Sequence, residues 1–332
     1  MKSIDLENHF LTEVFADALR TNKGYPRVDK DKGLGFAPEA WMPLGKAGEL
    51  RDLGEGRIKL MDTAGVDYAV LSLTSPGAEQ FDIEVGRKVA SESNDILADV
   101  IKQHPARFGG FASLAPKDVE WSVTELERCV KELGFSGWNT HSNFGDSHID
   151  EERYWPLLAK AQELDIPIYL HPAVPMIPQL RESGMVLSGP SFGFGTEVMY
   201  VFLRLIVRGV LDRFPKLKII MGHYGEALPF LVDRVDRAYM QGHSIPLPEF
   251  GPGSKHWASH YLKTNLWVTT SGNYLPAAFV CSRDALGLDK ILLGTDFPYE
   301  DMGDCMAFLN GLPLSEEERT KLYEANARAL GF

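Results

Sequence analysis

Cysteine is scarce in this chain of 332 residues, which holds only Cys129, Cys281 and Cys305. None of the three has a second cysteine at Cys-x-x-Cys spacing. The scarcity argues against a disulfide framework, and the spacing argues against a zinc site built from thiolates. Reduced thiols in a cytoplasmic protein are therefore expected.

Three further features are missing from the sequence. No apolar run reaches 18 residues, so no membrane span is predicted. The first residues, MKSIDLENHF, carry charges and a histidine where a signal peptide needs an apolar stretch. The net charge is −12, with no block of five or six like charges. Nucleic acid and anionic membranes are therefore poor partners. A small anionic substrate stays compatible with this charge, because a bound divalent ion dominates the field of its own site.

What the sequence does have is a regular alternation of apolar, β-branched runs with helical patterns. Such runs are typical of parallel strands buried on both faces. We predict an α/β fold, a (β/α)8 TIM barrel forming one domain over residues 1–332, with residues 11–48 as a long insertion after strand one near the active-site mouth. An open doubly wound sheet is the rival, but no GxGxxG follows strand one. The expected strands are IDLENHF, DYAVLSL, RFGGFASLAP, FSGWNTH, IPIYLHP, LKIIMGH, NLWVTTSG and DKILLGTD.

Helical patterns fill the segments between these strands. Residues 11–48 are predicted as loop, with one helical piece around Thr12–Leu19. ELRDLGEGRIKLMDTAG is predicted as a helix that stops at Gly65, and GTEVMYVFLRLIVRGVLDRFP as another. The last predicted helix runs from about Ser315 to Leu330.

Four of the predicted strands end in a potential metal ligand or proton donor. The ends of strands in a (β/α)8 barrel converge on one face, where such folds build their active sites. A divalent-metal enzyme is therefore the leading hypothesis. The four strand ends are Glu7-Asn8-His9, His171, His223 and Asp296.

The first two strand ends offer one carboxylate and two imidazoles. Glu7 and His9 are two apart on a strand, so both side chains point to one face and can reach one ion. A salt-bridged glutamate with a surface histidine is the alternative. His171 precedes a proline that turns the chain out of the strand. Its imidazole is a ready nitrogen ligand, and a buried structural histidine is the alternative.

The other two strand ends offer acid–base groups. Glu226 lies three residues after His223 and can accept the imidazole N–H, which would fix the tautomer of His223. Asp296 closes an apolar strand, where a carboxylate is costly to bury unless it is paired or bound to a metal. A helix N-cap is the alternative for Asp296.

The remaining candidates are weaker. Asn139, Thr270 and Ser271 lie near strand ends, and Thr74 to Gly77 follow strand two; they are interpreted as hydrogen-bonding wall residues or as turn formers. Solvated side chains in polar loops are the expectation for His141, His148, His243, His256 and His260.

Two carboxylates with one or two imidazoles form a mixed oxygen and nitrogen set that suits Zn²⁺ or Mn²⁺. Strand four, FSGWNT, offers no lysine or acidic residue to bridge a second ion, so one ion is expected. Glu7 and Asp296 together would cancel its charge of +2. Such a site is better suited to holding a chelating substrate than to activating water.

The motifs ExH at strand one, LHP at strand five, GHxGE at strand six and TDxPYE at strand eight resemble the amidohydrolase superfamily. More narrowly, they resemble its non-oxidative aromatic acid decarboxylases, which act on salicylate-, resorcylate- and dihydroxybenzoate-type acids and are related to aminocarboxymuconate-semialdehyde decarboxylase. Stretches such as DLGEGRIKLMDTAGVDYAVLSLTSPG and LDRFPKLKIIMGHYGEALP match the same group. The resemblance covers the chain from Lys2 to Phe332.

The resemblance implies roles for individual residues. Metal ligation would fall to Glu7, His9, His171 and Asp296. Asp296 would also protonate the ring carbon that bears the carboxylate, and His223, oriented by Glu226, would assist proton transfer. Arg234 would belong to the polar network of the site. Together with Phe297 and with Thr74, Pro76, Asn139 and Ser271, which are proposed from their places after strands, it completes the expected substrate-binding set.

The resemblance also implies a homodimer or homotetramer, with no organic cofactor. Phe297 stands where several relatives carry tryptophan, and the segment from Thr12 to Gly48 is longer than in smaller members, so both would reshape the pocket. The expected reaction is reversible decarboxylation of a hydroxybenzoate, by protonation of the ipso carbon and release of CO₂. The alternatives are a metal-dependent lactone or amide hydrolase, a hydratase, and a non-catalytic barrel.

Overall fold

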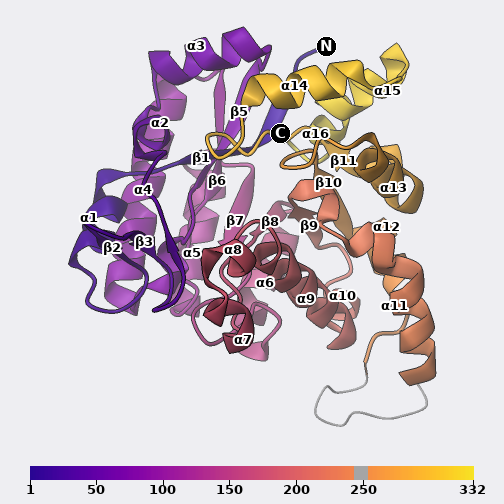
Figure 1. Ribbon diagram of the computed structural model, residues 1–332, viewed down its shortest axis with the longest axis horizontal. Helices are drawn as coiled ribbons and strands as arrows, with labels where there is room; N and C mark the ends of the chain where they lie inside the picture. Colours follow the sequence, from indigo (N-terminus) through magenta and orange to yellow (C-terminus); the bar gives the residue numbers. More distant parts are fainter. Residues whose placement is uncertain (243–252) are drawn as a thin grey trace.

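The computed structural model describes residues 1–242 and 253–332, and eight parallel strands lie at its centre (Figure 1). All eight predicted strands are present and follow one another around the sheet in chain order. The strands are β1 (Ile4–Phe10), β5 (Tyr68–Leu73), β6 (Phe108–Ala112), β7 (Gly137–His141), β8 (Pro167–His171), β9 (Lys218–Met221), β10 (Leu266–Thr269) and β11 (Ile291–Leu292).

The segment after β11 returns to β1 and closes the sheet. The Asp296 amide donates to the Glu7 carbonyl at 2.8 Å, and the His9 amide donates to the Phe297 carbonyl at 2.7 Å. Asn8 and Phe297 form a parallel bridge between these hydrogen bonds. The predicted barrel is thus confirmed, and its rival, the open doubly wound sheet, is wrong. Closure also brings Asp296 beside Glu7.

The apolar core has two parts, because the strands are buried on both faces. One cluster fills the space between the strands and the surrounding helices. The other fills the barrel interior, where Phe332 packs against Phe111 with ring centroids 5.4 Å apart. The remaining fully buried strand residues of the interior cluster are Ile4, Leu6, Val70, Tyr169, Ile220 and Leu292.

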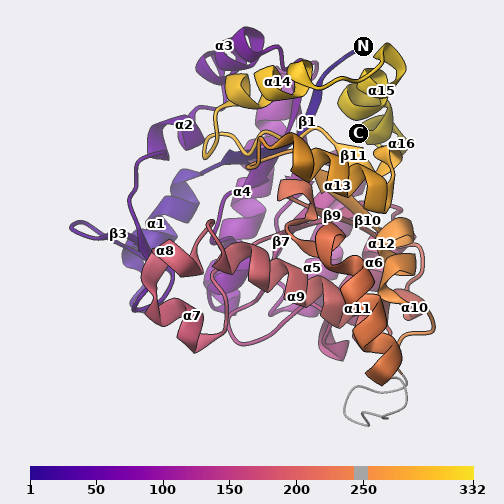
Figure 2. The ribbon, with the colours of Figure 1, turned by 45° about the vertical axis from the view of Figure 1, so that its right-hand side comes forward.

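Helices surround the strands, as two views show (Figures 1 and 2). No helix within residues 1–242 and 253–332 combines the length and the apolarity needed to cross a membrane. The helices are α1 (Glu13–Thr21), α2 (Ala47–Arg51), α3 (Glu55–Ala64), α4 (Ile83–Gln103), α5 (Val119–Lys131), α6 (Trp155–Glu163), α7 (Pro178–Glu182), α8 (Gly184–Ser188), α9 (Gly193–Val207), α10 (Val210–Arg213), α11 (Leu228–Gly242), α12 (Ala258–Asn265), α13 (Pro276–Leu286), α14 (Met302–Gly311), α15 (Glu316–Thr320) and α16 (Asn326–Ala329).

Three predicted helices are divided in the structure. The helix expected to stop at Gly65 does stop there, with a left-handed φ of 81°, but Asp52 to Gly54 separate its first part, α2, from α3. Gly209, also left-handed at φ 71°, separates α9 from α10. The last helix begins with a capping box at Ser315 and contains a π-helical stretch, η6 (Lys321–Ala325), between α15 and α16.

Residues 11–48 are more ordered than the predicted loop. Helix α1 confirms the expected helical piece, and its N-cap Thr12 accepts from the Phe15 amide. A small antiparallel sheet, which the sequence did not reveal, follows it in the order β2 (Arg27–Asp29), β3 (Gly33–Gly35), β4 (Trp41–Met42). Strands of two or three residues are too short to show a period of two in the sequence.

Candidate metal centre

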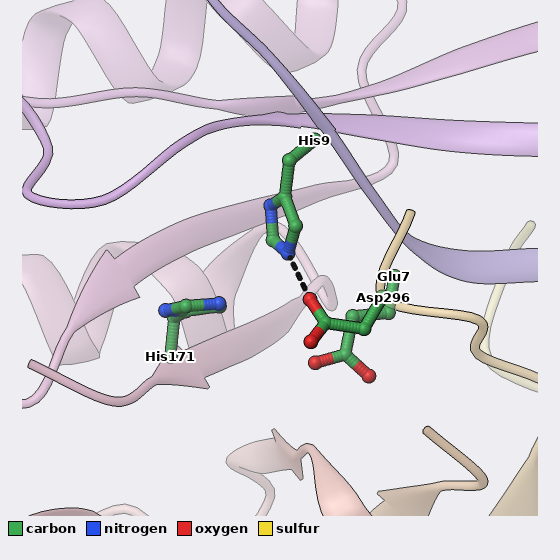
Figure 3. Close-up of side chains that lie close together, drawn as sticks. All are labelled: Glu7, His9, His171 and Asp296. Carbon is green, nitrogen blue, oxygen red and sulfur yellow. Dashed lines mark hydrogen bonds and ion pairs between the residues drawn. The ribbon is translucent and has the colours of Figure 1, made fainter. Parts of the chain in front are cut away.

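Four side chains converge at the carboxyl ends of the strands. Glu7 and His9 come from β1, His171 ends β8, and Asp296 follows β11. Each offers one ligand atom, and these atoms all lie within 4.8 Å of one another. Figure 3 shows the two imidazoles and the two carboxylates turned toward a common space. The predicted ligand set is thus brought together in full.

A β-bulge in β1 makes this convergence possible. The pairing of β1 with β5 shifts register between Asp5 and Asn8, so β1 holds one residue more than its partner there. Leu6 belongs to the interior core, and strict alternation would send Asn8 inward with it. The extra residue changes the alternation, so Glu7 and His9 face the site while Asn8 faces α3.

The residues present fit a divalent cation. Glu7 is 1% exposed; its Oε2 accepts from Thr269 Oγ1 at 2.6 Å, but its Oε1 is buried without a hydrogen-bond partner. Burying an ionised oxygen without a hydrogen-bond partner costs free energy unless a nearby cation compensates its charge. A second carboxylate, that of Asp296, lies in the same cluster, and two such groups repel each other without a positive charge between them.

The histidine ligands have hydrogen-bond partners on their other ring nitrogens. His171 Nδ1 donates to the Pro172 carbonyl at 2.9 Å, which leaves Nε2 as a free lone pair. Burial, with His9 and His141 nearby, holds the pKa of His171 well below its usual value. His9 Nδ1 lies 3.0 Å from Ser72 Oγ. Such partners fix the ring orientation and tautomer of a metal-ligating histidine.

His223 and Glu226 form the predicted pair beside these ligands. His223 Nδ1 donates to Glu226 Oε1 at 2.8 Å, and the His223 amide donates to Ser271 Oγ at 3.0 Å. His223 Nε2 lies 3.9 Å from Glu7 Oε1 and 3.6 Å from Asp296 Oδ2. Burial opposes protonation of His223, but Glu226, Glu7 and Asp296 outweigh it and raise its pKa well above the usual value.

Three of these side chains stand on strained backbone. His223, Glu226 and Asp296 have φ values of 54°, 57° and 61°, in the left-handed region that non-glycine residues rarely adopt. Such outliers concentrate at functional sites. Burial alone would raise the pKa of Asp296, but His223 and His9 outweigh it and hold this pKa below its usual value. The Asp296 carboxylate is therefore ionised next to a cationic His223.

A cavity of about 600 Å³ borders the cluster. The surface segments around Phe36 and Phe194 meet across it, with ring centroids 6.5 Å apart. An engineered cavity of about 150 Å³ holds a benzene molecule, so this one has room for a substituted aromatic ring. Besides these two phenylalanines, its lining consists of Met42, Ser75, His171, Pro172, Pro190, Ser191, His223, Glu226, Gly272, Asn273, Asp296, Tyr299 and Glu300.

Of the predicted wall residues, Ser75 lines this cavity, whereas Thr74, Pro76, Asn139 and Ser271 are absent from its described lining. Thr74 and Pro76 line two smaller neighbouring cavities. Asn139 is buried and donates to the Leu73 carbonyl at 3.5 Å. Ser271 does not line the cavity itself, but it contacts His223 by accepting a hydrogen bond from the His223 amide. Arg234 is exposed on α11, so the chain by itself does not bring it to the cavity.

Phe297 corrects one expectation. Phe297 is 8% exposed, and its ring centroid lies 5.2 Å from the guanidinium carbon of Arg57. It lines a pocket on the other side of β1 from the candidate ligands. Phe297 forms the parallel bridge with Asn8, and its ring faces Arg57 while Asp296 faces the site. Phe297 therefore does not shape the cavity directly.

The sequence reading missed several buried groups near the ligands. His141, expected in solvent, is 1% exposed at the end of β7; its Nδ1 lies 2.8 Å from Glu79 Oε1 and its Nε2 3.0 Å from Ser75 Oγ. Ser75 Oγ in turn lies 3.3 Å from His171 Nδ1. The available signal was its position, because His141 ends a predicted strand as the other candidates do.

Three other histidines of that group can also be placed. His148 is 7% exposed and its Nε2 lies 3.1 Å from Glu197 Oε1, so it too is buried rather than solvated. His256 and His260 are exposed as expected, with rings 4.1 Å apart. His243 lies outside the described residues.

Comparisons with known proteins agree with this geometry. Residues 4–330 match the family model described as amidohydrolase. The chain is 34% identical to a gamma-resorcylate decarboxylase of Polaromonas sp. (strain JS666 / ATCC BAA-500) over 336 residues, covering 98% of this chain and 97% of the relative.

Two solved structures are similar over nearly their whole length. One is the 5-carboxyvanillate decarboxylase of Novosphingobium aromaticivorans DSM 12444 with manganese and 4-hydroxy-3-methoxy-5-nitrobenzoic acid, at a TM-score of 0.90, 34% identity and coverage of 99% of this chain and 95% of that chain. The other is the dihydroxybenzoic acid decarboxylase of Polaromonas sp. JS666 with manganese and 2-nitroresorcinol, at a TM-score of 0.84, 33% identity and coverage of 99% and 96%.

Proposed function

The chain belongs to the amidohydrolase family, and within it we propose a metal-dependent, non-oxidative decarboxylase of a hydroxybenzoate-type aromatic acid. The observation that carries the proposal is the cluster of Glu7, His9, His171 and Asp296, whose ligand atoms lie within 4.8 Å of one another beside a cavity of about 600 Å³. Relatives that bind manganese together with small aromatic compounds support it.

Glu7, His9, His171 and Asp296 are proposed to hold one Mn²⁺ or Zn²⁺. A divalent ion held there would supply the positive charge that favours a chelating hydroxybenzoate and stabilises its phenolate. The mixed oxygen and nitrogen donors suit either metal. No organic cofactor is required, because the electrons of the broken bond return to the ring.

Proton transfer is assigned to Asp296 and His223. In the metal-free protein His223 and His9 favour the ionised form of Asp296, so Asp296 must gain a proton before it can act as an acid. Cationic His223, with Nε2 3.6 Å from Asp296 Oδ2, can supply that proton, while Glu226 keeps the imidazole oriented. Asp296 then protonates the ring carbon that bears the carboxylate.

Cleavage follows from this protonation. The protonated carbon is tetrahedral and the ring has lost its aromaticity. Breaking the bond to the carboxylate leaves the electron pair in the ring, restores aromaticity and releases neutral CO₂. The same groups serve the reverse carboxylation, because each step is microscopically reversible.

The test is to load the purified protein with Mn²⁺ and incubate it with salicylate, 2,3- and 2,6-dihydroxybenzoate and 5-carboxyvanillate. Ultraviolet absorbance follows loss of the acid, and a coupled assay follows CO₂. We expect turnover of at least one acid, abolished by a chelator. Hydrolysis of a lactone or an amide, with no acid consumed by the metal-loaded protein, would instead favour the hydrolase alternative.

Two further proposals concern the assembly and its setting. We propose a homodimer or homotetramer, on the basis of family resemblance, and light scattering of the purified protein tests it. A cytoplasmic location is proposed from the three cysteines, which form no disulfide in the described residues. Fractionation of cells that express the full chain tests this location.

A further inference from the structure

A second, apolar cavity of about 180 Å³ lies against the wall of the metal-site cavity. It lies between helix α1, strand β3 and the segment that leads into α2. Its leucine walls come from one stretch of the chain, residues 11–50, and Leu19, Leu34 and Leu50 are at most 6% exposed. The apolar lining consists mainly of Leu11, Leu19, Leu34, Met42, Leu44 and Leu50.

The polar groups on this wall are already paired. Thr74 Oγ1 and the Tyr299 hydroxyl lie 2.5 Å apart in a hydrogen bond. Ser75 Oγ is 3.0 Å from His141 Nε2. Lys46 also lines the cavity, but it is exposed to solvent. The leucine-lined part of the cavity holds water poorly and accepts apolar ligands.

Three residues line both cavities, namely Met42, Ser75 and Tyr299. The Tyr299 ring is also 5.7 Å from the ring of the metal ligand His9. A ring bound at the metal therefore lies close to the wall behind which the apolar cavity begins. Met42 stands in this wall, and its unbranched thioether can change rotamer to let a substituent pass.

We propose that the apolar cavity is a subsite for an alkyl substituent of the aromatic acid, so that the preferred substrate is an alkylated hydroxybenzoate. This inference rests on the proposed function and specifies its substrate class. The volume slightly exceeds the about 150 Å³ that accommodates benzene, so a chain of up to about six carbons fits. The segment of residues 11–48 thereby acquires a role in specificity, because most of the subsite walls come from it.

The first experiment compares substrates. It uses 2,4-dihydroxybenzoates with hydrogen, methyl, propyl or pentyl at ring carbon 6, and 2,6-dihydroxybenzoates with the same groups at carbon 4. We expect kcat/KM in one series to rise about three- to four-fold per buried methylene. Binding of the corresponding alkylresorcinols to the Mn²⁺-loaded protein, measured by calorimetry, reports on the subsite without any turnover.

The second experiment fills the subsite. Ala47 lies at the start of α2, is half-buried and lines the apolar cavity but not the metal-site cavity. Ala47→Phe should lower the ratio of kcat/KM for the pentyl acid to that for the unsubstituted acid at least ten-fold. Ala106→Phe is the matched control, because Ala106 is exposed before β6, at the opposite end of the barrel.

The outcomes separate this inference from the proposed function. Turnover of the unsubstituted acid with no gain from alkyl chains, or a gain that survives Ala47→Phe, overturns the subsite alone. Alkylresorcinol binding that strengthens with chain length and is lost in Ala47→Phe, without decarboxylation of any acid, supports the subsite and overturns the decarboxylase. Absence of both effects overturns both.

Discussion

His9 Nε2 and Asp296 Oδ1 lie 3.0 Å apart, although 287 positions separate the two residues in the chain. The backbone around them provides the reason, because the Asp296 amide bonds to the Glu7 carbonyl where the barrel closes. Barrel closure and assembly of the ligand cluster are therefore the same event.

Replacing Asp296 tests its proposed double role. Asp296→Asn keeps the size of the side chain but removes the group that can carry a proton to the ring. We expect turnover by the metal-loaded variant to fall by about 10³-fold or more. Stopped-flow absorbance with a hydroxybenzoate measures it. Activity close to wild type in a variant that contains metal would remove Asp296 from the proton pathway.

His223 is expected to serve the chemistry more than the binding of metal. His223→Asn should lower kcat about 10²-fold while metal content, measured by plasma emission, stays near that of wild type. Glu226→Gln should give a smaller loss, since Glu226 acts through its 2.8 Å hydrogen bond to His223. Exposed His256 provides the matched control, His256→Asn. Equal loss of kcat and metal in His223→Asn would make His223 a ligand.

A buried cation supports the strand that carries two of the ligands. Arg57 is fully buried and donates to Asn8 Oδ1 at 2.6 Å, to the Asp52 carbonyl at 2.7 Å and to the Glu49 carbonyl at 2.8 Å. Arg57→Met leaves these acceptors unpaired and should lower the free energy of unfolding by about 3 kcal/mol. Urea denaturation measures it.

The control for Arg57 is a surface arginine close by. Arg51→Met removes an exposed side chain whose ion pair with Glu13 spans 3.4 Å, and should change stability by less than about 0.5 kcal/mol. If both variants lost a similar free energy of unfolding, the buried hydrogen bonds of Arg57 would contribute no more to stability than the surface ion pair of Arg51.

The stability of the metal-free protein should depend on pH through His171. Its pKa is depressed in the folded state, so below pH 6.5 the unfolded chain takes up a proton that the folded chain does not. Folding stability is therefore lost as pH falls. Between pH 7.5 and 5.5 the wild type should lose about 1.4 kcal/mol more than His171→Gln. Urea denaturation at both pH values checks this, and parallel losses in the two proteins would contradict a depressed pKa.

The sequence contained enough to predict the barrel and the cluster of candidate ligands, because both depend on local patterns. Apolar runs mark buried strands wherever they occur, and Glu7, His9, His171 and Asp296 each stand at the end of one. In a closed barrel those ends meet, so proximity follows from topology without knowledge of any contact.

The rest depends on pairing between distant segments. The bulge in β1 exists only relative to β5, and no residue type at Leu6 or Glu7 announces it. The residues next to Phe297 in the sequence do not show which face of the barrel wall its side chain takes. In the structure it faces Arg57 rather than the cavity. His141 was placed in solvent because its partner Glu79 lies 62 positions away, on a different connection of the barrel.

The most direct test of the central claim is a crystal structure of protein loaded with Mn²⁺, with anomalous diffraction to locate the metal. The account predicts one Mn²⁺ per chain, bound by Glu7, His9, His171 and Asp296 together. A metal bound elsewhere, or a fully loaded protein in which Glu7 and Asp296 do not contact the same ion, would contradict it.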